Sequence, residues 1–337
     1  MVTYRNVNKK SHDNILKSSF VIDTVIYRSL KNYPDKDIKL VYFSLELGAT
    51  FLLAKIMCLY IYDMFGKVIS FTDLMSWQNI LSDEDYECVK ASRQWLDSVM
   101  DKLIIYDKAL NAKSFYATMM GLLEEWGDFT ESSDGRRTIY TKNNPEQLVL
   151  VVIDHVGLCT PSAGSDKKQE IDKISQYCVT LREKCEVSFY LIQQENRNSS
   201  NMDRRKADMT ECSPEDLKDT GNTYNDSEVC LGIYYPLKHK IKTHRGYPII
   251  TEGTGNGFIG LRDRYRNCLL IKNRKGVSDR AIPLNFFGEL GLFNQLDKPE
   301  TINDWKPYLS LETKDSETED VPENKSQEPI NSFNFKF

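Results

Sequence analysis

Residues 148–154, LVLVVID, decide the fold class of this chain. The apolar residues follow one another without alternation, and the run ends in a carboxylate, Asp154. A strand with apolar side chains on both faces is typical of a parallel sheet that helices cover on both sides. Because an unpaired buried carboxylate costs free energy, Asp154 at the end of such a strand is a candidate functional residue.

Further short apolar runs lie on both sides of this strand and alternate with amphipathic stretches. The runs predict strands at 39–46, 102–106, 148–154, 187–193, 228–234, 268–272 and 282–287. The amphipathic stretches predict helices at 20–30, 51–62, 83–100 and 114–126, and along the stripe Ile171, Ile174, Cys178 and Leu181. Alternation of strands and helices over about 250 residues predicts an α/β fold with a mostly parallel central sheet flanked by helices.

The sequence divides into one large domain and two polar ends. We expect a ragged N-terminal segment at 1–13, a single domain at 14–311 and a disordered acidic tail at 312–337. The tail holds seven acidic residues against three lysines. Within the domain, the polar and turn-rich stretch 127–146 is expected to be an insertion.

Composition excludes several classes of protein. No window of the 337 residues approaches the 18 apolar residues of a membrane span, and the N-terminus lacks a secretory signal. Eight cysteines occur singly without a CxxC pair, which favours a reducing compartment over a disulfide scaffold or a zinc ribbon. We therefore expect a soluble cytoplasmic protein. The net charge of −5 falls mostly on the tail, so any nucleic-acid site must come from local loops.

Polar side chains stand where several predicted strands end. Ligands of parallel sheets bind beyond the carboxyl ends of the strands. Those ends carry Glu46, Asp154, Gln194, Lys272 and Arg274. Two acids, an amide and a pair of cations resemble the machinery of phosphoryl transfer, where positioning and charge stabilisation supply most of the catalysis.

Five ordered motifs make this likeness specific. They are YFSLEL (42–47), VVIDHVGL (151–158), IQQENR (192–197), EDLKDTGNTYNDSEVCLGIYY (215–235) and IKNRKG (271–276). Their order and spacing resemble the RecA-like P-loop NTPase motor domain of DnaB-type replicative helicases, over roughly residues 14–290.

The resemblance implies a role for each strand-end residue. Glu46 is the candidate base that orients the attacking water, and Asp154 is the Walker B acid that supports Mg²⁺ beside ATP. Gln194 resembles the sensor of the γ-phosphate. Lys272 and Arg274 resemble the basic finger pair that enters the ATP site of the next subunit.

The phosphate loop departs from the family pattern. The matching window is 11–18, SHDNILKS, in which Lys17 and Ser18 stand where the phosphate-binding lysine and the Mg²⁺-binding hydroxyl belong. Both glycines are missing, Leu16 replaces the second, and the first glycine of the chain is Gly48. A phosphate cradle needs the backbone conformations and close approach that glycine allows.

Two basic loops take the places of the family's central-channel DNA loops. Their cations are Lys167 and Lys168 in 159–169, and Arg197, Arg204, Arg205 and Lys206 in 197–212. Phosphate contacts from these cations would be independent of sequence and sensitive to salt. By resemblance, the partners are single-stranded DNA, further copies in a homo-hexameric ring, and a primase or helicase loader.

The predicted function is ATP-driven translocation on single-stranded DNA with unwinding of duplex DNA in replication. The family's N-terminal primase-binding domain has no counterpart before residue 14, which fits a phage or mobile-element source. A catalytically impaired, helicase-derived DNA-binding or scaffold protein without a working P-loop is the alternative. A recombinase or repair ATPase on the same core is a third interpretation.

Overall fold

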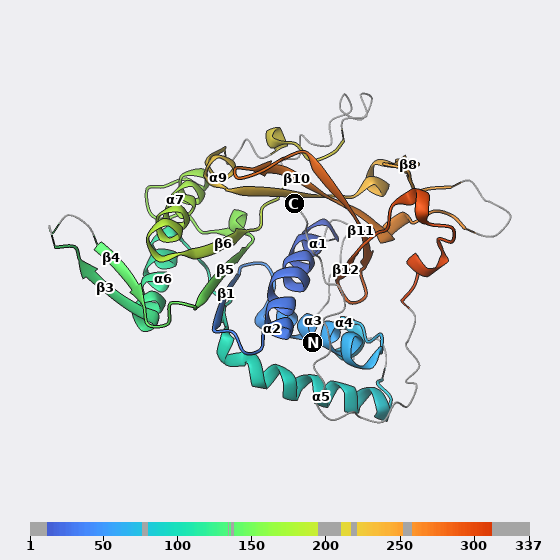
Figure 1. Ribbon diagram of the computed structural model, residues 1–337, viewed down its shortest axis with the longest axis horizontal. Helices are drawn as coiled ribbons and strands as arrows, with labels where there is room; N and C mark the ends of the chain where they lie inside the picture. Colours follow the sequence, from blue (N-terminus) through green and yellow to red (C-terminus); the bar gives the residue numbers. More distant parts are fainter. Residues whose placement is uncertain are drawn as a thin grey trace.

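Two four-stranded sheets dominate the molecule, one parallel and one antiparallel (Figure 1). The computed structural model describes residues 12–75, 80–133, 135, 138–194, 210–216, 221–251 and 258–311. In Figure 1 the long antiparallel strands lie above the parallel sheet, and the blue helix α1 lies between the two.

The parallel sheet has the order β2-β1-β5-β6. Its strands are β1 (Ile38–Ser44), β2 (Leu103–Tyr106), β5 (Leu148–Asp154) and β6 (Val187–Leu191). β5 pairs on both edges and is fully buried from Val151 to Asp154, as the unbroken apolar run predicted. Ser44 lies opposite Asp154 in the register, so β1 and β5 end side by side.

Helices cover both faces of this sheet, which confirms the predicted α/β class. The long ones are α3 (Ala49–Phe65), α5 (Asp83–Val99), α6 (Ala112–Trp126) and α7 (Lys167–Cys185), and the short α4 (Phe71–Leu74) follows α3. Alternate side chains of β1 enter different cores. Val41 and Phe43 pack with α6 and α7, whereas Leu40 and Tyr42 pack with α3, α5 and the N-terminal helix.

The N-terminal helix joins the two sheets. α1 (His12–Val21) continues through a π-helical turn, η1 (Ile22–Tyr27), into α2 (Arg28–Asn32). Within η1, the buried Asp23 accepts a hydrogen bond of 2.8 Å at Oδ2 from the main-chain N–H of Phe293, in the second sheet. This segment therefore packs against the parallel sheet on one side and the antiparallel sheet on the other.

The second sheet is antiparallel and has the order β12-β11-β10-β7. It is built from β7 (Val229–Tyr234), β10 (Tyr265–Asn273), β11 (Arg280–Phe287) and β12 (Leu292–Gln295). Connections of a few residues join β10 to β11 and β11 to β12. A parallel crossover needs a dozen residues or more, so these strands can only form hairpins. The last three predicted strands thus exist, but they lie outside the parallel sheet.

The stretch predicted as a polar insertion forms a hairpin of β3 (Gly127–Glu131) and β4 (Thr138–Lys142). It projects from the left end of the molecule in Figure 1. A smaller hairpin, β8 (Thr243–His244) and β9 (Tyr247–Pro248), belongs to the other end.

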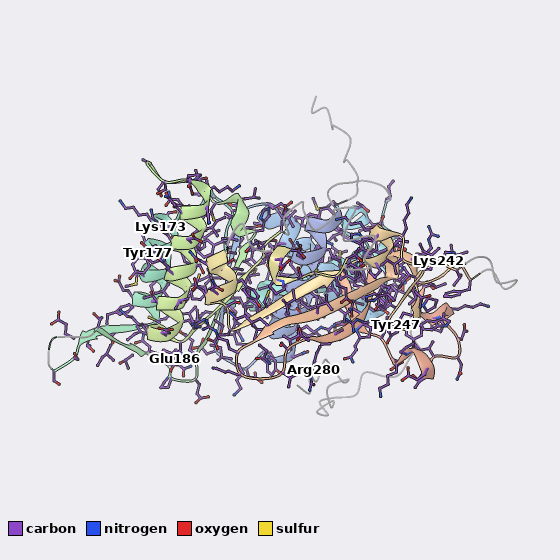
Figure 2. The ribbon with its side chains drawn as sticks, turned by 90° about the horizontal axis from the view of Figure 1, so that it is seen from above. Lys173, Tyr177, Glu186, Lys242, Tyr247 and Arg280 are labelled. Atoms are coloured by element: carbon purple, nitrogen blue, oxygen red, sulfur yellow. The ribbon has the colours of Figure 1, made fainter. Side chains whose placement is uncertain are left out.

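Figure 2 shows how far apart these regions lie. Lys173 and Tyr177 of α7 stand toward one end of the long axis, and Lys242 and Tyr247 stand toward the opposite end. In the part of the chain that the structure describes, no helix is long and apolar enough to cross a membrane.

Candidate functional site

A cluster of polar side chains forms where β1, β5 and β6 end. Glu46 follows β1, His155 follows β5 and Gln194 follows β6. His155 connects the other two, because its Nε2 lies 3.2 Å from Gln194 Nε2 and 3.9 Å from Glu46 Oε2. The structure therefore brings the predicted base and the predicted sensor to one imidazole ring.

Asp154 lies directly beneath this cluster and is fully buried. Its Oδ2 accepts a hydrogen bond of 2.6 Å from the hydroxyl of Tyr42, and its Oδ1 has no hydrogen-bond partner among the described residues. Burial raises the pKa of Asp154, while hydrogen bonding from Ser18 and Tyr42 lowers it and the charge of Glu46 raises it. The sequence analysis did not predict the contact between Tyr42 and Asp154.

His155 is the member of this cluster to which the sequence analysis gave no role. Burial lowers the pKa of His155, and the charges of Lys17 and Lys167 lower it further, against the opposite effect of Asp154. The amide nitrogen of Gln194 can only donate, so a neutral ring accepts this hydrogen bond at Nε2, the same nitrogen that lies 3.9 Å from Glu46 Oε2, while Nδ1 has no partner among the described residues. The signal was its place directly after the buried strand, beside Asp154.

Lys17 and Ser18 approach the same edge from α1. The ammonium group of Lys17 donates to the main-chain oxygen of Gln193 at 3.0 Å, one residue before Gln194. The buried Ser18 hydroxyl lies close enough to Asp154 to lower the pKa of its carboxyl group. Both side chains therefore lie at the carboxyl edge of the parallel sheet, Lys17 beside Gln193 and Ser18 beside Asp154.

The backbone around them differs from the expected phosphate loop. α1 begins at His12, so Lys17 and Ser18 lie inside a helix. Only the first four N–H groups of a helix lack an intrahelical acceptor, and those of Lys17 and Ser18 are not among them. Leu16, at the place of a loop glycine, packs with Cys268, Leu284 and Phe293. The main-chain N–H groups of Lys17 and Ser18 are therefore not available to cradle a phosphate.

The side-chain donors nevertheless suit Mg²⁺. This ion takes oxygen ligands and is typically held by one or two protein groups together with substrate phosphates and water. The unpartnered Oδ1 of Asp154 and the adjacent Ser18 hydroxyl match that donor set. In the described ranges, this edge included, no group of three or more His, Cys, Asp or Glu side chains is arranged to hold a metal ion.

Lys272 and Arg274 lie apart from this cluster, and both reach the C-terminal end of α9 (Gly221–Asp226). Lys272 Nζ donates to the main-chain oxygens of Tyr224 and Asn225, at 2.5 and 3.0 Å. Arg274 donates to Asn225 as well and lies 3.5 Å from the Glu228 carboxylate. Burial lowers the pKa of Lys272, and the neighbouring Arg274 lowers it further.

α9 links this pair to the strand ends. The Thr223 hydroxyl donates to the Gln193 side-chain oxygen at 3.0 Å, and Gln193 also receives Lys17. A displacement of the end of α9 that holds Lys272 and Arg274 would therefore shift the contact between Thr223 and Gln193, next to Gln194.

The predicted DNA-binding residues fall into two groups. Lys167 and Lys168 are exposed in the first turn of α7, after its N-cap Asp166, and not in the preceding loop. The remaining four, Arg197, Arg204, Arg205 and Lys206, lie outside the described residues.

Two solved structures share this architecture. A DnaB-like replicative helicase, solved for its interactions with primase, is 17% identical and superimposes with a TM-score of 0.60, over 84% of this chain and 55% of that one. A separately solved ATPase domain is 16% identical, with a TM-score of 0.61 over 84% of this chain and 81% of its own. The chain thus spans about half the length of the first relative, and at such identities the likeness establishes the fold alone.

No protein of curated function matches the chain. The family model described as the DnaB-like helicase C terminal domain matches residues 15–295, which include both sheets and every residue of the strand-end cluster. The chain therefore belongs to the family of DnaB-like helicase C-terminal domains, as its five motifs indicated.

Proposed function

We propose that this chain is the motor of an ATP-dependent DNA helicase, which moves along single-stranded DNA and unwinds duplex DNA as a homo-hexameric ring. The observation that carries the proposal is the convergence at one sheet edge. Glu46, His155 and Gln194 form one contact cluster above the buried Asp154, and Lys17 reaches the same edge from α1.

Each of these groups has a distinct task in ATP hydrolysis. Glu46 orients the attacking water, and Gln194 reports the state of the γ-phosphate through its contact with His155. Ser18 and Asp154 would hold Mg²⁺, which when bound supplies positive charge against the phosphate oxygens. Lys17 contributes a point charge to the phosphates after it exchanges its bond to the Gln193 oxygen.

Ring assembly and DNA binding complete the proposal. Lys272 and Arg274 act as the finger pair on the ATP site of the neighbouring subunit. The exposed Lys167 and Lys168 contact DNA phosphates, together with Arg197, Arg204, Arg205 and Lys206. A primase or a helicase loader is the proposed protein partner, and the cytoplasm is the proposed compartment.

One observation favours a second candidate function. Because Lys17 and Ser18 lie inside a helix and residues 12–18 lack glycine, the main-chain N–H groups of Lys17 and Ser18 are not available to the phosphates. A chain without those donors would keep the ring contacts and the DNA-binding loops without turnover. The second candidate is thus a catalytically impaired, helicase-derived protein that binds DNA.

Hydrolysis of ATP with and without single-stranded DNA separates the two candidates. We would compare the wild type with Glu46→Gln and with Glu183→Gln, a matched change of an exposed glutamate far from the strand ends. DNA-stimulated turnover that Glu46→Gln abolishes and Glu183→Gln preserves would support the helicase motor. Absence of turnover in all three proteins, with salt-sensitive DNA binding retained, would establish the impaired form instead.

A further inference from the structure

The last turn of α9 binds both members of the finger pair, Lys272 and Arg274. The ammonium group of Lys272 donates to the main-chain oxygens of Tyr224 and Asn225 and lies 4.8 Å from the centre of the Tyr224 ring. The guanidinium group of Arg274 donates to the Asn225 oxygen. The last carbonyl groups of a helix lack intrahelical partners, so basic side chains can bind there. The position of this turn therefore sets the position of both cations.

An irregularity in β10 directs the finger pair toward α9. Leu270 lies opposite Leu231 of β7, whereas Lys272 lies opposite Cys230, so the register shifts by one residue between them. A shift of this kind bends a strand and redirects the side chains that follow it. Lys272 and Arg274 follow the shift two residues apart, and both side chains reach the end of α9.

Two side chains of α7 bind the same end of α9. The buried Ser175 hydroxyl donates to Asp226 Oδ2 at 2.6 Å, and Arg182 donates from Nη1 to the main-chain oxygen of Asp226 at 3.1 Å. Ser175 and Arg182 are seven residues apart, so they lie on one face of α7 two turns from each other. Figure 1 shows α9 beside α7, near the end of β10. Asp226 therefore connects α7 with the turn that binds the finger pair.

Arg182 and Arg274 also share one carboxylate. Glu228 Oε1 lies 3.8 Å from Arg182 Nη2 and 3.5 Å from Arg274 Nη1. The main-chain oxygen of Glu228 accepts a further hydrogen bond of 2.9 Å from the Arg274 N–H. Because the two guanidinium groups carry like charge, a carboxylate close to both offsets their repulsion. Arg182 is thus linked to Arg274 through Glu228 as well as through the end of α9.

We propose that Arg182, together with Ser175, is a positioning residue for the finger pair. It acts through Asp226 and Glu228, which fix the turn and the carboxylate that hold the two cations. Lysine and arginine side chains lose much rotamer freedom when they are ordered. A cation that must meet a phosphate in the neighbouring subunit is therefore more effective when its side chain is already held in place. The inference rests on the proposed role of the finger pair at that subunit's ATP site.

Hydrogen exchange of the full chain, measured by mass spectrometry, tests whether Arg182 holds the end of α9. We would compare the wild type with Arg182→Ala and with Arg182→Lys, which keeps a donor for the Asp226 oxygen. Arg93→Ala is the matched control, because it removes an exposed arginine and its ion pair from α5. Arg182→Ala should raise the exchange rate in peptides over 222–230 about fivefold. Arg182→Lys should stay within about twofold of the wild type, and the control should not change this rate.

Two further exchange measurements connect this turn with the finger pair. Lys272→Ala/Arg274→Ala should also raise exchange over 222–230, because the finger pair and Arg182 bind the same turn and such coupling is reciprocal. Peptides over β1 and β5 are the internal control for folding, and their exchange should be the same in every variant.

Turnover of ATP, followed by release of radiolabelled phosphate, tests whether Arg182 acts through the finger pair. Arg182→Ala should lower kcat about tenfold and leave KM within about twofold, because a finger acts on the transition state more than on the bound substrate. The same change in the Lys272→Ala/Arg274→Ala background should lower kcat no further, since the groups that Arg182 positions are then absent. A general loss of packing would lower kcat in both backgrounds.

Two results would overturn the inference. One is exchange over 222–230 that stays unchanged in Arg182→Ala or in Lys272→Ala/Arg274→Ala. The other is a tenfold loss of kcat that Arg182→Ala causes equally when the finger pair is absent. If none of the proteins hydrolyses ATP, the proposed motor fails instead, and the exchange rates over 222–230 alone decide whether Arg182 positions these cations.

Discussion

The buried carboxylate of Asp23 should give the protein a specific dependence of stability on pH. Asp23 is fully buried in η1, where its Oδ1 lies 3.1 Å from Arg28 Nε and its Oδ2 accepts from the Phe293 N–H. Burial raises the pKa of Asp23 from 3.8 to about 6, even though Arg28 and the Phe293 N–H lower it. The carboxylate is therefore held in its charged form at a cost in free energy at neutral pH.

The direction in which stability changes with pH follows from proton linkage. Between pH 3.8 and about 6 the folded protein binds a proton at Asp23 that the unfolded chain does not bind. The contribution of this group to stability is thus most favourable below pH 3.8 and is lost as the pH rises to about 6. A rise of the pKa from 3.8 to about 6 corresponds to about 3 kcal/mol of unfolding free energy.

Asp23→Asn isolates this contribution, because asparagine has a similar shape and does not titrate. Urea unfolding of both proteins at several pH values gives the difference in unfolding free energy, wild type minus variant. This difference should fall by about 2–3 kcal/mol between pH 4 and pH 7, while the same comparison for the exposed Asp97→Asn should not fall. A difference for Asp23→Asn that stays constant or grows with pH would refute the reasoning.

Three further outcomes are expected. Asp154→Asn removes a buried charge with an unpartnered oxygen, so the melting temperature without divalent cations should rise by about 2–4 °C and the further shift caused by Mg²⁺ should disappear. A Mg²⁺ shift that survives in the variant would exclude Asp154 as a ligand. If the wild type hydrolyses ATP, Lys272→Ala and Arg274→Ala should each slow turnover by about 10³ without weakening ATP binding; unchanged turnover would remove the finger role. Lys167→Ala/Lys168→Ala should reduce the slope of log affinity for single-stranded DNA against log salt by about 1.4 between roughly 50 and 200 mM. An unchanged slope in that titration would place DNA elsewhere.

Strand positions were predictable where an apolar run is short and unbroken. The run 148–154 became β5 with the same bounds. How strands pair was not predictable from such runs, since their periodicity carries no information on the neighbouring strand. β12 (Leu292–Gln295) and the hairpin of β3 and β4 were missed because they are short and mostly polar.

The site was predictable to the extent that strand ends define it. Asp154 ends a strand, Glu46 and Gln194 follow strands, and the common edge of a parallel sheet brings them together. His155 and Tyr42 could not be assigned in the same way, because their contacts depend on side-chain direction and on the register of β1 against β5. No local sequence pattern could predict that Asp23 accepts a hydrogen bond from the N–H of Phe293, because Phe293 is 270 residues away.

Side-chain ligands and main-chain ligands of phosphate and metal require different backbone structures. Side-chain donors need only a helix in the right position, and α1 has that position because Leu16 packs against the second sheet while Ser18 faces Asp154. Main-chain donors need a loop, and a helix that starts at His12 uses the N–H groups of Lys17 and Ser18 internally. Packing can therefore keep the proposed Mg²⁺ ligands, Ser18 and Asp154, together without the glycines, whereas it cannot replace the cradle. Retention of Lys17, Ser18 and Asp154 in place is thus compatible with both proposed functions, and the turnover of ATP is what distinguishes them.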